Sequence, residues 1–356
     1  MPAQTVFSDD RSEELKGANQ LRSQAYQAEA PPQPVIPGLA GGRDLVSMRD
    51  LSPAEVEALF HLTSLVKTRP EDFRTALAGK HIAMFFEKPS LRTRITFEAG
   101  ICGLGGSVSF IDQRQERLDA RESLSDIAHN LERWVSAIVL RTFAHETVEG
   151  IAEHACVPVI NALSEIEHPC QALADYFTLQ EKFGDLKKIT LAYVGDGNNV
   201  LHSLLLSGAL LGSNIRVGTP KGYGPSRQVL ADAQEIAKKT GASIELMTDA
   251  HKAVRGVDAI YTDAWTSMGH ERESEERTRI FPPFQVNDEL MAEAAPHAVF
   301  MHCLPAHRNE EVTDAVIDSV QSVVFDQAEN RMHIQKAILM MLVGNKNHLP
   351  LRSAHA

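Results

Sequence analysis

The sequence of 356 residues predicts an α/β fold in which helices join two doubly wound parallel-sheet domains. Short apolar runs alternate with helix-like patterns along most of the chain, which is typical of parallel sheets whose two faces are covered. The runs fall into two series, which a polar break at residues 184–188 separates. The length also suits two domains of ordinary size.

The first ordered element is expected near Asp44, after an extension of different composition. Residues 1–42 are polar and then rich in Pro, Ala and Gly, so we expect them to be disordered, although residues 13–28 could form a short helix. Ser52 and Glu55, with a proline between them, predict a capping box at the start of the next helix.

The remaining elements follow from apolar patterns. The first series predicts strands over Ile82–Phe86, Ser107–Ile111, Ala137–Leu140 and Val157–Asn161, and a helix over Pro169–Phe183. The second series predicts strands over Ile189–Val194, Asn214–Gly218, Ser243–Met247, Ala259–Thr262, Ala298–His302 and Val323–Phe325. A last helix over Gln327–Val343 is apolar enough to pack back on the first domain. We therefore expect domains at 43–184, joined by 327–345, and at 185–326.

The composition restricts the class of protein. A net charge of −12 and a pI of about 5.7 argue against a broad nucleic-acid surface, so an anion site must be a local basic pocket. The cysteines form no C-x-x-C pair, which argues against a zinc ribbon or a disulfide framework and fits a reducing compartment. Neither a membrane span nor a targeting peptide is indicated, so we expect a cytoplasmic protein.

The most informative motif lies between the strand at Ile82–Phe86 and the helix that follows it. Ser90, Arg92, Thr93 and Arg94 place hydroxyls and guanidinium groups at a helix start. Free backbone N–H groups and the helix dipole favour phosphate there, and arginine adds matching donors. The alternative is a solvated helix start whose arginines pair with nearby glutamates.

Further polar residues follow other strands of the first series. Because ligands bind at the carboxyl ends of parallel strands, these residues are expected to share one cleft. Arg141 could bind a phosphate or carbonyl oxygen there, or form a surface ion pair. His168 and Gln171 could grip a small planar group, although a lone histidine is more often structural.

The second series adds motifs of the same kind. The run from Gly195 to Asn199 resembles the start of a dinucleotide fingerprint, but it lacks the third glycine, so its asparagines could instead orient a polar substrate. Asp263, before the Ser267-Met268-Gly269 turn, suits an ammonium group. The charged segment 270–279 is expected to be a solvated loop, either a lid or a plain surface loop.

The strand at Ala298–His302 leads into Cys303 and Leu304. A cysteine at a strand end close to basic residues could have a lowered pKa, and the alternative is a buried, inert thiol. Arg331, near the start of the last helix, could reach the same pocket.

Taken together, the motifs K-P-S-x-R-T-R at 88–94, H-P-C-Q at 168–171, G-D-G-N-N at 195–199, D-x-x-x-S-M-G at 263–269 and H-C-L-P at 302–305 resemble the transcarbamoylase family. Within that family the chain is most similar to the ornithine carbamoyltransferases. The resemblance extends from about Asp44 to Val343. Each motif alone is weak, but all five occur in the family's order.

The resemblance implies a carbamoyl phosphate-binding domain followed by an ornithine-binding domain. It implies transfer of the carbamoyl group to ornithine, which gives citrulline and phosphate in arginine metabolism, with no metal or organic cofactor. It also implies a homotrimer, or a multiple of trimers, with active sites between subunits. The sequence leaves open whether the flow is biosynthetic or catabolic.

By matching position, the resemblance assigns carbamoyl phosphate to Ser90, Leu91, Arg92, Thr93, Arg141, His168, Gln171, Cys303, Leu304 and Arg331. It assigns ornithine to Asn199, Asp263, Ser267 and Met268, and catalysis to Cys303, Arg141 and His168. One position departs from the family pattern. Where a neighbouring subunit commonly donates a glutamine, this chain has Arg117, so Arg117 or Arg121 could supply charge instead.

Other functions stay open at this point. Putrescine, N-acetylornithine or aspartate could replace ornithine as the acceptor, although the Ser267 turn favours ornithine. An NAD-dependent dehydrogenase could share the second domain, but the missing third glycine counts against it. A catalytically silent paralogue is a further alternative, which the retained Arg92, Arg141 and Cys303 argue against.

Overall fold

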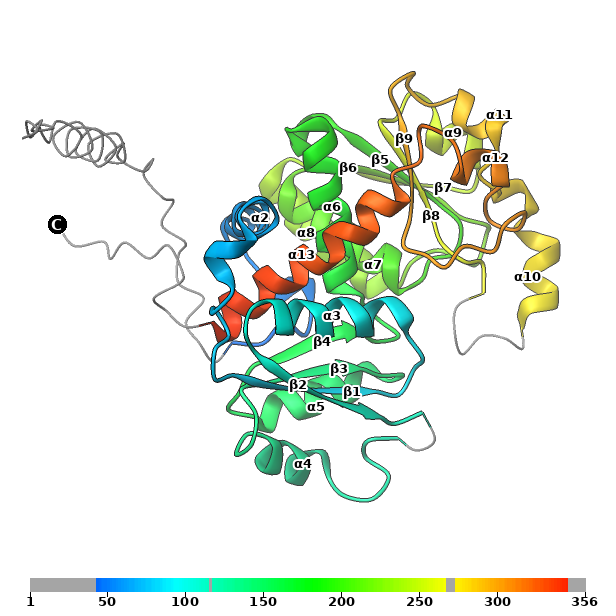
Figure 1. The fold of residues 1–356 in the computed structure, drawn as a ribbon. Coiled ribbons are helices and arrows are strands. Elements are labelled where there is room, and N and C mark those ends of the chain that lie inside the picture. The colour runs from blue at the N-terminus through cyan, green and yellow to red at the C-terminus, as the bar shows by residue number, and fades with distance from the viewer. Residues whose placement is uncertain (1–42, 115–116, 267–272, 345–356) are drawn as a thin grey trace, which may run out of the picture. The chain divides into compact units, whose positions relative to one another are not determined.

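The computed structural model describes residues 43–114, 117–266 and 273–344, and these contain two parallel β-sheets (Figure 1). The first sheet has four strands in the order β2-β1-β3-β4, and the second has five in the order β7-β6-β5-β8-β9. The strands are β1 (His81–Phe86), β2 (Ser107–Asp112), β3 (Ala137–Arg141), β4 (Val159–Leu163), β5 (Thr190–Val194), β6 (Asn214–Gly218), β7 (Ile244–Met247), β8 (Ala259–Thr262) and β9 (Val299–His302). Helices connect the strands, which confirms the predicted α/β class.

The helices that surround the sheets are α2 (Pro53–Thr68), α3 (Leu91–Gly103), α4 (Leu124–Leu131), α5 (His145–His154), α6 (Pro169–Phe183), α7 (Asn199–Leu211), α8 (Arg227–Thr240), α9 (Ala250–Val254), α10 (Ser274–Ile280), α11 (Asp288–Ala292), α12 (Asp314–Ile317) and α13 (Val324–Val343). Short 3-10 helices are η1 (Met48–Asp50), η2 (Pro70–Phe73), η3 (Leu186–Lys188) and η5 (Pro282–Phe284). None of the helices in the described ranges combines the length and apolar character needed to cross a membrane.

Alternate residues of the strands pack on opposite faces, which fixes where the helices lie. In β1, Ala83 and Phe85 join a core with residues of α4 and α5, such as Ile127 and Val148. Their neighbours Ile82 and Met84 belong to a second core, which includes α2, α6 and α13. Because both faces of the strand are buried, its sequence reads as a continuous apolar run.

The last helix packs back on the first half of the chain, as the sequence predicted. α13 contacts α2, α3 and α6, and its N-terminal end also contacts β9 of the second sheet (Figure 1). Its residues Ile334, Ile338 and Met341 are buried in the same core as the β1 side chains. Helix α13 therefore extends from the second sheet to the side of the first sheet on which α3 lies.

The predicted helix over Pro169–Phe183 and the strands at Asn214–Gly218 and Ala259–Thr262 have the predicted bounds, and the other strands differ by one or two residues at their ends. The exception is the strand predicted at Val323–Phe325, which is wrong. Val324 and Phe325 open α13, and the β-bridge to β9 that the described residues show here joins the preceding Ser322 to Phe300. A three-residue apolar run does not distinguish a strand from a helix start.

Two further expectations concern the start of α2 and the N-terminal extension. The capping box of α2 is confirmed, because the Ser52 side chain accepts from Glu55 N at 3.3 Å and Ser52 N donates to the Glu55 carboxylate at 2.7 Å. The extension 1–42, including the helix expected over 13–28, lies outside the described residues.

Candidate active site

One cavity of about 630 Å³ lies at the carboxyl ends of strands from both sheets. Its wall includes all the predicted site residues that are described, namely Ser90, Leu91, Arg92, Thr93, Arg141, His168, Gln171, Asn199, Asp263, Cys303, Leu304 and Arg331. Ser267 and Met268 lie outside the described residues. Residues that are far apart in sequence therefore share one concave surface, as expected for parallel sheets.

The hydroxyl of Thr93 lies within hydrogen-bond distance of two arginine side chains. Ser90 caps α3, and its side chain accepts from the backbone N–H of Thr93 at 3.1 Å. The Thr93 Oγ1 atom accepts a short hydrogen bond from Nη2 of Arg331 and lies 3.5 Å from Nη1 of Arg141. Two guanidinium groups from β3 and α13 thus converge on the first turn of a helix.

The side chains of this group are buried. Arg141, His168 and Arg331 are each at most 5% exposed, and among the described residues the Nε atoms of both arginines have no hydrogen-bond partner. Burial, followed by the charge of Arg331, lowers the pKa of Arg141 to about 9. Buried like charges are costly without a counter-charge, so the arrangement favours binding of an anion.

His168 has a defined tautomer in this group. Its Nε2 atom lies 3.2 Å from Nη2 of Arg331, and a guanidinium can only donate, so Nε2 accepts and the proton is on Nδ1. Burial, Arg331 and Arg141 lower the pKa of His168 well below its usual value, which keeps the ring neutral. Nδ1–H has no partner among the described residues and can donate to a carbonyl oxygen.

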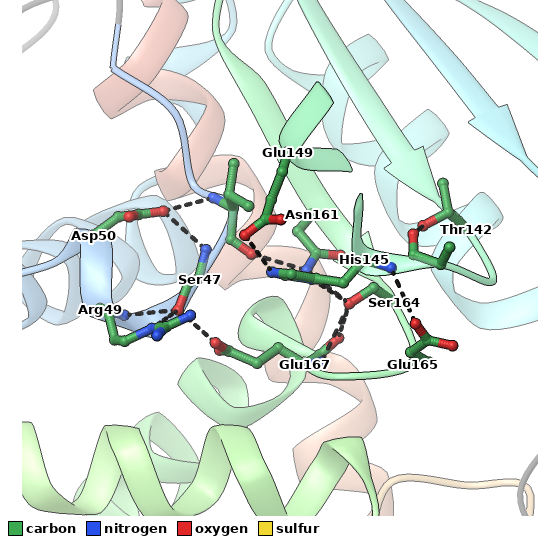
Figure 2. Close-up of polar contacts among 12 residues, drawn as sticks. Ser47, Arg49, Asp50, Thr142, His145, Glu149, Asn161, Ser164, Glu165 and Glu167 are labelled. Atoms are coloured by element: carbon green, nitrogen blue, oxygen red, sulfur yellow. Dashed lines mark hydrogen bonds and ion pairs between the residues drawn. The ribbon is translucent and has the colours of Figure 1, made fainter. Parts of the chain in front are cut away.

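Figure 2 shows the polar contacts that support the segment between β4 and α6, which leads to His168. The buried Glu167 carboxylate accepts from Met48 N at 2.9 Å and from the Ser47 hydroxyl, which joins this segment to η1. Ser164 hydrogen-bonds His145 Nδ1 at 2.7 Å. The carbonyl of Ser164 in turn accepts from Asn199 Nδ2 at 2.6 Å, so the segment also contacts α7.

The same cavity also holds a carboxylate. Asp263 follows β8, and it accepts from Asn198 Nδ2 at 2.7 Å and from its neighbour Ala264 N at 2.8 Å. Cys303 Sγ donates to the same carboxylate at 3.1 Å. An anionic group at this position suits a substrate that carries an ammonium group.

The lowered pKa that the sequence suggested for Cys303 is wrong. Burial, and then the neighbouring Asp263 carboxylate, raise the pKa of the Cys303 thiol well above its ordinary value. Arg331 acts in the opposite direction but is a smaller effect. Cys303 is therefore a neutral thiol that donates a hydrogen bond, because a thiolate beside Asp263 would place two negative charges together.

Arg277 is a cavity residue that the sequence reasoning missed. The segment 270–279, expected to be a loop, contains most of the helix α10 (Ser274–Ile280), and Arg277 of this helix is buried. Arg277 forms ion pairs with Asp196 and Glu273, both at 2.9 Å, and donates to the Trp265 carbonyl at 2.6 Å. The Glu273–Arg277 spacing of four residues was the available signal for a helix.

The glycines of the G-D-G turn have a structural explanation. A Cβ atom on Gly197 would lie 2.2 Å from the backbone of Gly224, so only glycine allows this close approach. Gly195 has a φ of 141°, which favours glycine. These constraints account for both residues without a dinucleotide.

Arg117 and Arg121 lie away from this cavity. Both line a second cavity, of about 970 Å³, together with Trp134, Asp112 and Glu122. Arg117 also pairs with Asp119 at 3.1 Å, and Trp134 is 70% exposed. Whether either arginine serves a neighbouring subunit remains a prediction.

The sequence matches two family models. Residues 43–181 match the aspartate/ornithine carbamoyltransferase carbamoyl-P binding domain, and residues 187–342 match the Asp/Orn binding domain of the same family. Ornithine carbamoyltransferase of Pyrococcus abyssi is 49% identical over 85% of this chain and 96% of its own length. The protein named ornithine carbamoyltransferase, anabolic, of Pyrococcus furiosus is 48% identical over 85% and 97%.

The fold agrees with these matches. The solved structure of ornithine carbamoyltransferase from Pyrococcus furiosus has a TM-score of 0.82, at 48% identity, over 85% of this chain and 97% of that one. The identity and coverage exceed what a shared fold alone would give, and the motifs at the cavity are those that carried the resemblance. The chain belongs to the aspartate/ornithine carbamoyltransferase family.

Proposed function

We propose that this protein is an ornithine carbamoyltransferase, which converts carbamoyl phosphate and L-ornithine into L-citrulline and phosphate. The observation that carries the proposal is that buried Arg141 and Arg331 converge on Thr93, with neutral His168 beside Arg331. Asp263 lines the same cavity. The first group suits a phosphate next to a carbonyl, and the carboxylate suits an amino acid's ammonium group. The names of the relatives at 48–49% identity support the same activity.

The hydrogen-bond donors and arginines of the cavity would mainly stabilise the negative charge that develops during the reaction. As the amine attacks the carbamoyl carbon, negative charge grows on the carbonyl oxygen and then on the leaving phosphate. Thr93, Arg92, Arg141 and Arg331 line the cavity where the phosphate would lie. His168 would donate from Nδ1 to the carbonyl oxygen, because its Nε2 is already occupied by Arg331.

The proton of the ornithine δ-ammonium must leave before attack. Cys303 is not suited to accept it, because its raised pKa keeps it protonated. We therefore assign Cys303 the role of holding Asp263 in place through the 3.1 Å hydrogen bond. The ammonium first releases one proton to solvent, and the neutral amine then forms the N–C bond. The C–O bond to phosphate breaks, and the departing phosphate takes the second proton from the attacking nitrogen. Holding the two substrates in register supplies much of the remaining acceleration.

We further propose that residues 43–184, completed by 327–345, bind carbamoyl phosphate and that 185–326 bind ornithine. The names of the two matching family models support this division. Arg331 nevertheless comes from α13, near the end of the second matched region, so binding of carbamoyl phosphate would depend on the packing of that helix on α3 and α6.

Assembly, location and pathway are proposals of the same kind. We propose a homotrimer, supported by the family resemblance and by the exposed Trp134 beside the second cavity. A cytoplasmic location is supported by cysteine usage. A role in arginine biosynthesis is supported by the anabolic relative of Pyrococcus furiosus.

The test is an assay of phosphate release from carbamoyl phosphate, with ornithine, putrescine, N-acetylornithine and aspartate as parallel acceptors. We expect turnover with ornithine alone, and citrulline as the product. Turnover with another acceptor would keep the carbamoyl phosphate site but overturn the ornithine assignment. Absence of turnover with every acceptor would favour the silent paralogue.

A further inference from the structure

A buried carboxylate lies directly behind the candidate site. Asp175 is on α6, one turn after Gln171, and is 0% exposed. Its Oδ1 accepts from Gln171 Nε2 and from Gln327 Nε2, both at 2.7 Å, and its Oδ2 accepts from the Tyr261 hydroxyl at 3.0 Å. Asp175 thus joins α6, α13 and β8 but is not part of the cavity wall.

We propose that Asp175 is a positioning residue that fixes the Gln171 side-chain amide with its oxygen toward the cavity, and thereby selects a substrate carrying an NH₂ group on the reacting carbon. This inference rests on the proposed carbamoyl transfer. It assigns a function to a residue that none of the sequence motifs singled out.

The orientation of Gln171 follows from donor and acceptor chemistry. An amide has a donating NH₂ and an accepting oxygen, and only the NH₂ can pair with a carboxylate oxygen. Turning the amide would set Gln171 Oε1 against Asp175 Oδ1, which brings two acceptors together. Gln171 Oε1 therefore faces away from Asp175, and it has no hydrogen-bond partner among the described residues.

This orientation does not depend on the protonation of Asp175. Burial raises the pKa of Asp175 to about 7, so both forms can be populated near neutral pH. The Oδ1 atom already accepts from two amides, so a proton would be carried by Oδ2, toward the Tyr261 hydroxyl. Oδ1 remains an acceptor in either case, and Gln171 keeps its orientation.

The fixed oxygen has a consequence for the substrate. The oxygens of a phosphate dianion and a carbonyl oxygen only accept hydrogen bonds, so within carbamoyl phosphate Gln171 Oε1 can pair only with the NH₂ group. Acetyl phosphate has nearly the same shape, but it carries a methyl group in place of the NH₂. Its binding would leave Gln171 Oε1 buried without a donor, which is unfavourable.

Gln327 extends the same network to the other half of the site. Its Nε2 donates to Asp175, and its Oε1 accepts from the backbone N–H of His302 at 3.1 Å. His302 directly precedes Cys303, which lines the cavity. Through these contacts Asp175 fixes the position of the Gln171 amide relative to the C-terminal end of β9, which leads into Cys303.

The experiment compares carbamoyl phosphate with acetyl phosphate in the wild type, Asp175→Asn, Asp175→Ala and Asp175→Ser. The kinetics with carbamoyl phosphate are measured together with competitive inhibition by acetyl phosphate. Loss of one hydrogen bond to a charged group predicts that Ala and Ser reduce kcat/KM for carbamoyl phosphate by about tenfold to a hundredfold. Inhibition by acetyl phosphate should stay the same or become tighter, because acetyl phosphate makes no use of the Gln171 oxygen and is no longer disfavoured once the amide can turn.

Asp175→Asn separates positioning from charge. Asparagine keeps an oxygen that can accept from both glutamines, and its NH₂ can donate to the Tyr261 hydroxyl, so we expect kcat/KM within about fivefold of the wild type. If the Asn variant lost as much selectivity as the Ala variant, the orienting role would be overturned.

A double-mutant cycle with Gln171→Ala distinguishes positioning from a general structural effect. If Asp175 acts through Gln171, Asp175→Ala should add less than about threefold to the loss caused by Gln171→Ala. Additive losses would overturn the proposal. Thermal melting checks that each variant folds, and the Ser variant replaces Ala in the cycle if Ala does not.

Thr178→Val is the matched control. Thr178 is also buried on α6, and it accepts from Asn330 Nδ2 at 3.0 Å, but it does not line the cavity. We expect a lower melting temperature with unchanged selectivity between the two acyl phosphates. If the wild type shows no carbamoyl transfer at all, the proposed function fails. Wild-type transfer with unchanged selectivity in the Ala and Ser variants would overturn only the role of Asp175.

Discussion

Arg331 donates a hydrogen bond to Nε2 of His168, across 3.2 Å, and the same Nη2 atom donates to the Thr93 hydroxyl. One guanidinium therefore fixes the tautomer of His168 and adds positive charge at the proposed phosphate position. The imidazole is kept neutral by burial and by the cationic charge of Arg331 and Arg141. His168 and Arg331 thus act as one unit.

Arg331→Ala should lower kcat/KM for carbamoyl phosphate by about a hundredfold or more, since removal of one preorganised donor commonly costs that much. The binding of ornithine should change far less. Steady-state kinetics with each substrate varied in turn will measure both effects. Lys336→Met, which removes a cation from the same helix outside the cavity, is the control and should be near normal. Near-normal kinetics in Arg331→Ala would contradict the phosphate assignment.

Cys303 should react slowly with iodoacetamide in the folded protein, because the partly buried thiol beside Asp263 has a raised pKa. Asp263→Asn removes the carboxylate charge and should speed alkylation at Cys303, while Cys102, which is exposed, should react equally fast in both proteins. Mass spectrometry of the alkylated peptides gives the two rates separately. Rapid alkylation of Cys303 in the wild type would show that it is a thiolate after all.

Arg277→Met keeps an unbranched apolar side chain but removes the donors to Asp196, Glu273 and the Trp265 carbonyl. Because Trp265 closely follows Asp263, we expect KM for ornithine to rise by about tenfold or more, with KM for carbamoyl phosphate nearly unchanged. Arg279→Met, on the exposed side of the same helix, is the matched control. Equal changes in both KM values would indicate a general loss of structure instead.

Asp175→Asn should change how stability depends on pH. The pKa of Asp175 rises from 3.8 to about 7 on burial, so the folded state binds more protons than the unfolded state between these values. The wild type therefore loses stability from this group as pH rises through that range, whereas asparagine does not titrate. The melting temperature of the variant, minus that of the wild type, should increase from about pH 5 to about pH 8. A difference that is constant with pH would contradict the raised pKa.

Most of the fold could be predicted because buried parallel strands read as continuous apolar runs. The runs at residues 82–86 and 137–140 correspond to strands whose alternate side chains are buried in two different cores. The strand predicted at Val323–Phe325 was wrong, because a short apolar run also suits a buried helix start. The helix α10 was not predicted, because its many charged residues suggested a solvated loop, although its Arg277 is buried.

The site could be located from sequence because parallel strands bring their carboxyl ends to one edge. That rule placed Arg141, Asp263 and Cys303 on one cavity. It could not give protonation, since the neutral state of His168 and the raised pKa of Cys303 depend on burial and on neighbours distant in sequence. Asp175 was not predicted for the same reason, as its partners lie on three different elements.

The central claim is that one cavity binds both substrates, with the acyl phosphate at Arg331 and the amino acid at Asp263. Calorimetric titration with N-(phosphonoacetyl)-L-ornithine, in which a methylene group replaces the bridging oxygen, tests it most directly because this compound joins both substrates. We predict one binding event that Arg331→Ala and Asp263→Asn each weaken by about tenfold or more. Affinity that neither substitution changes, or no binding at all, would contradict the claim.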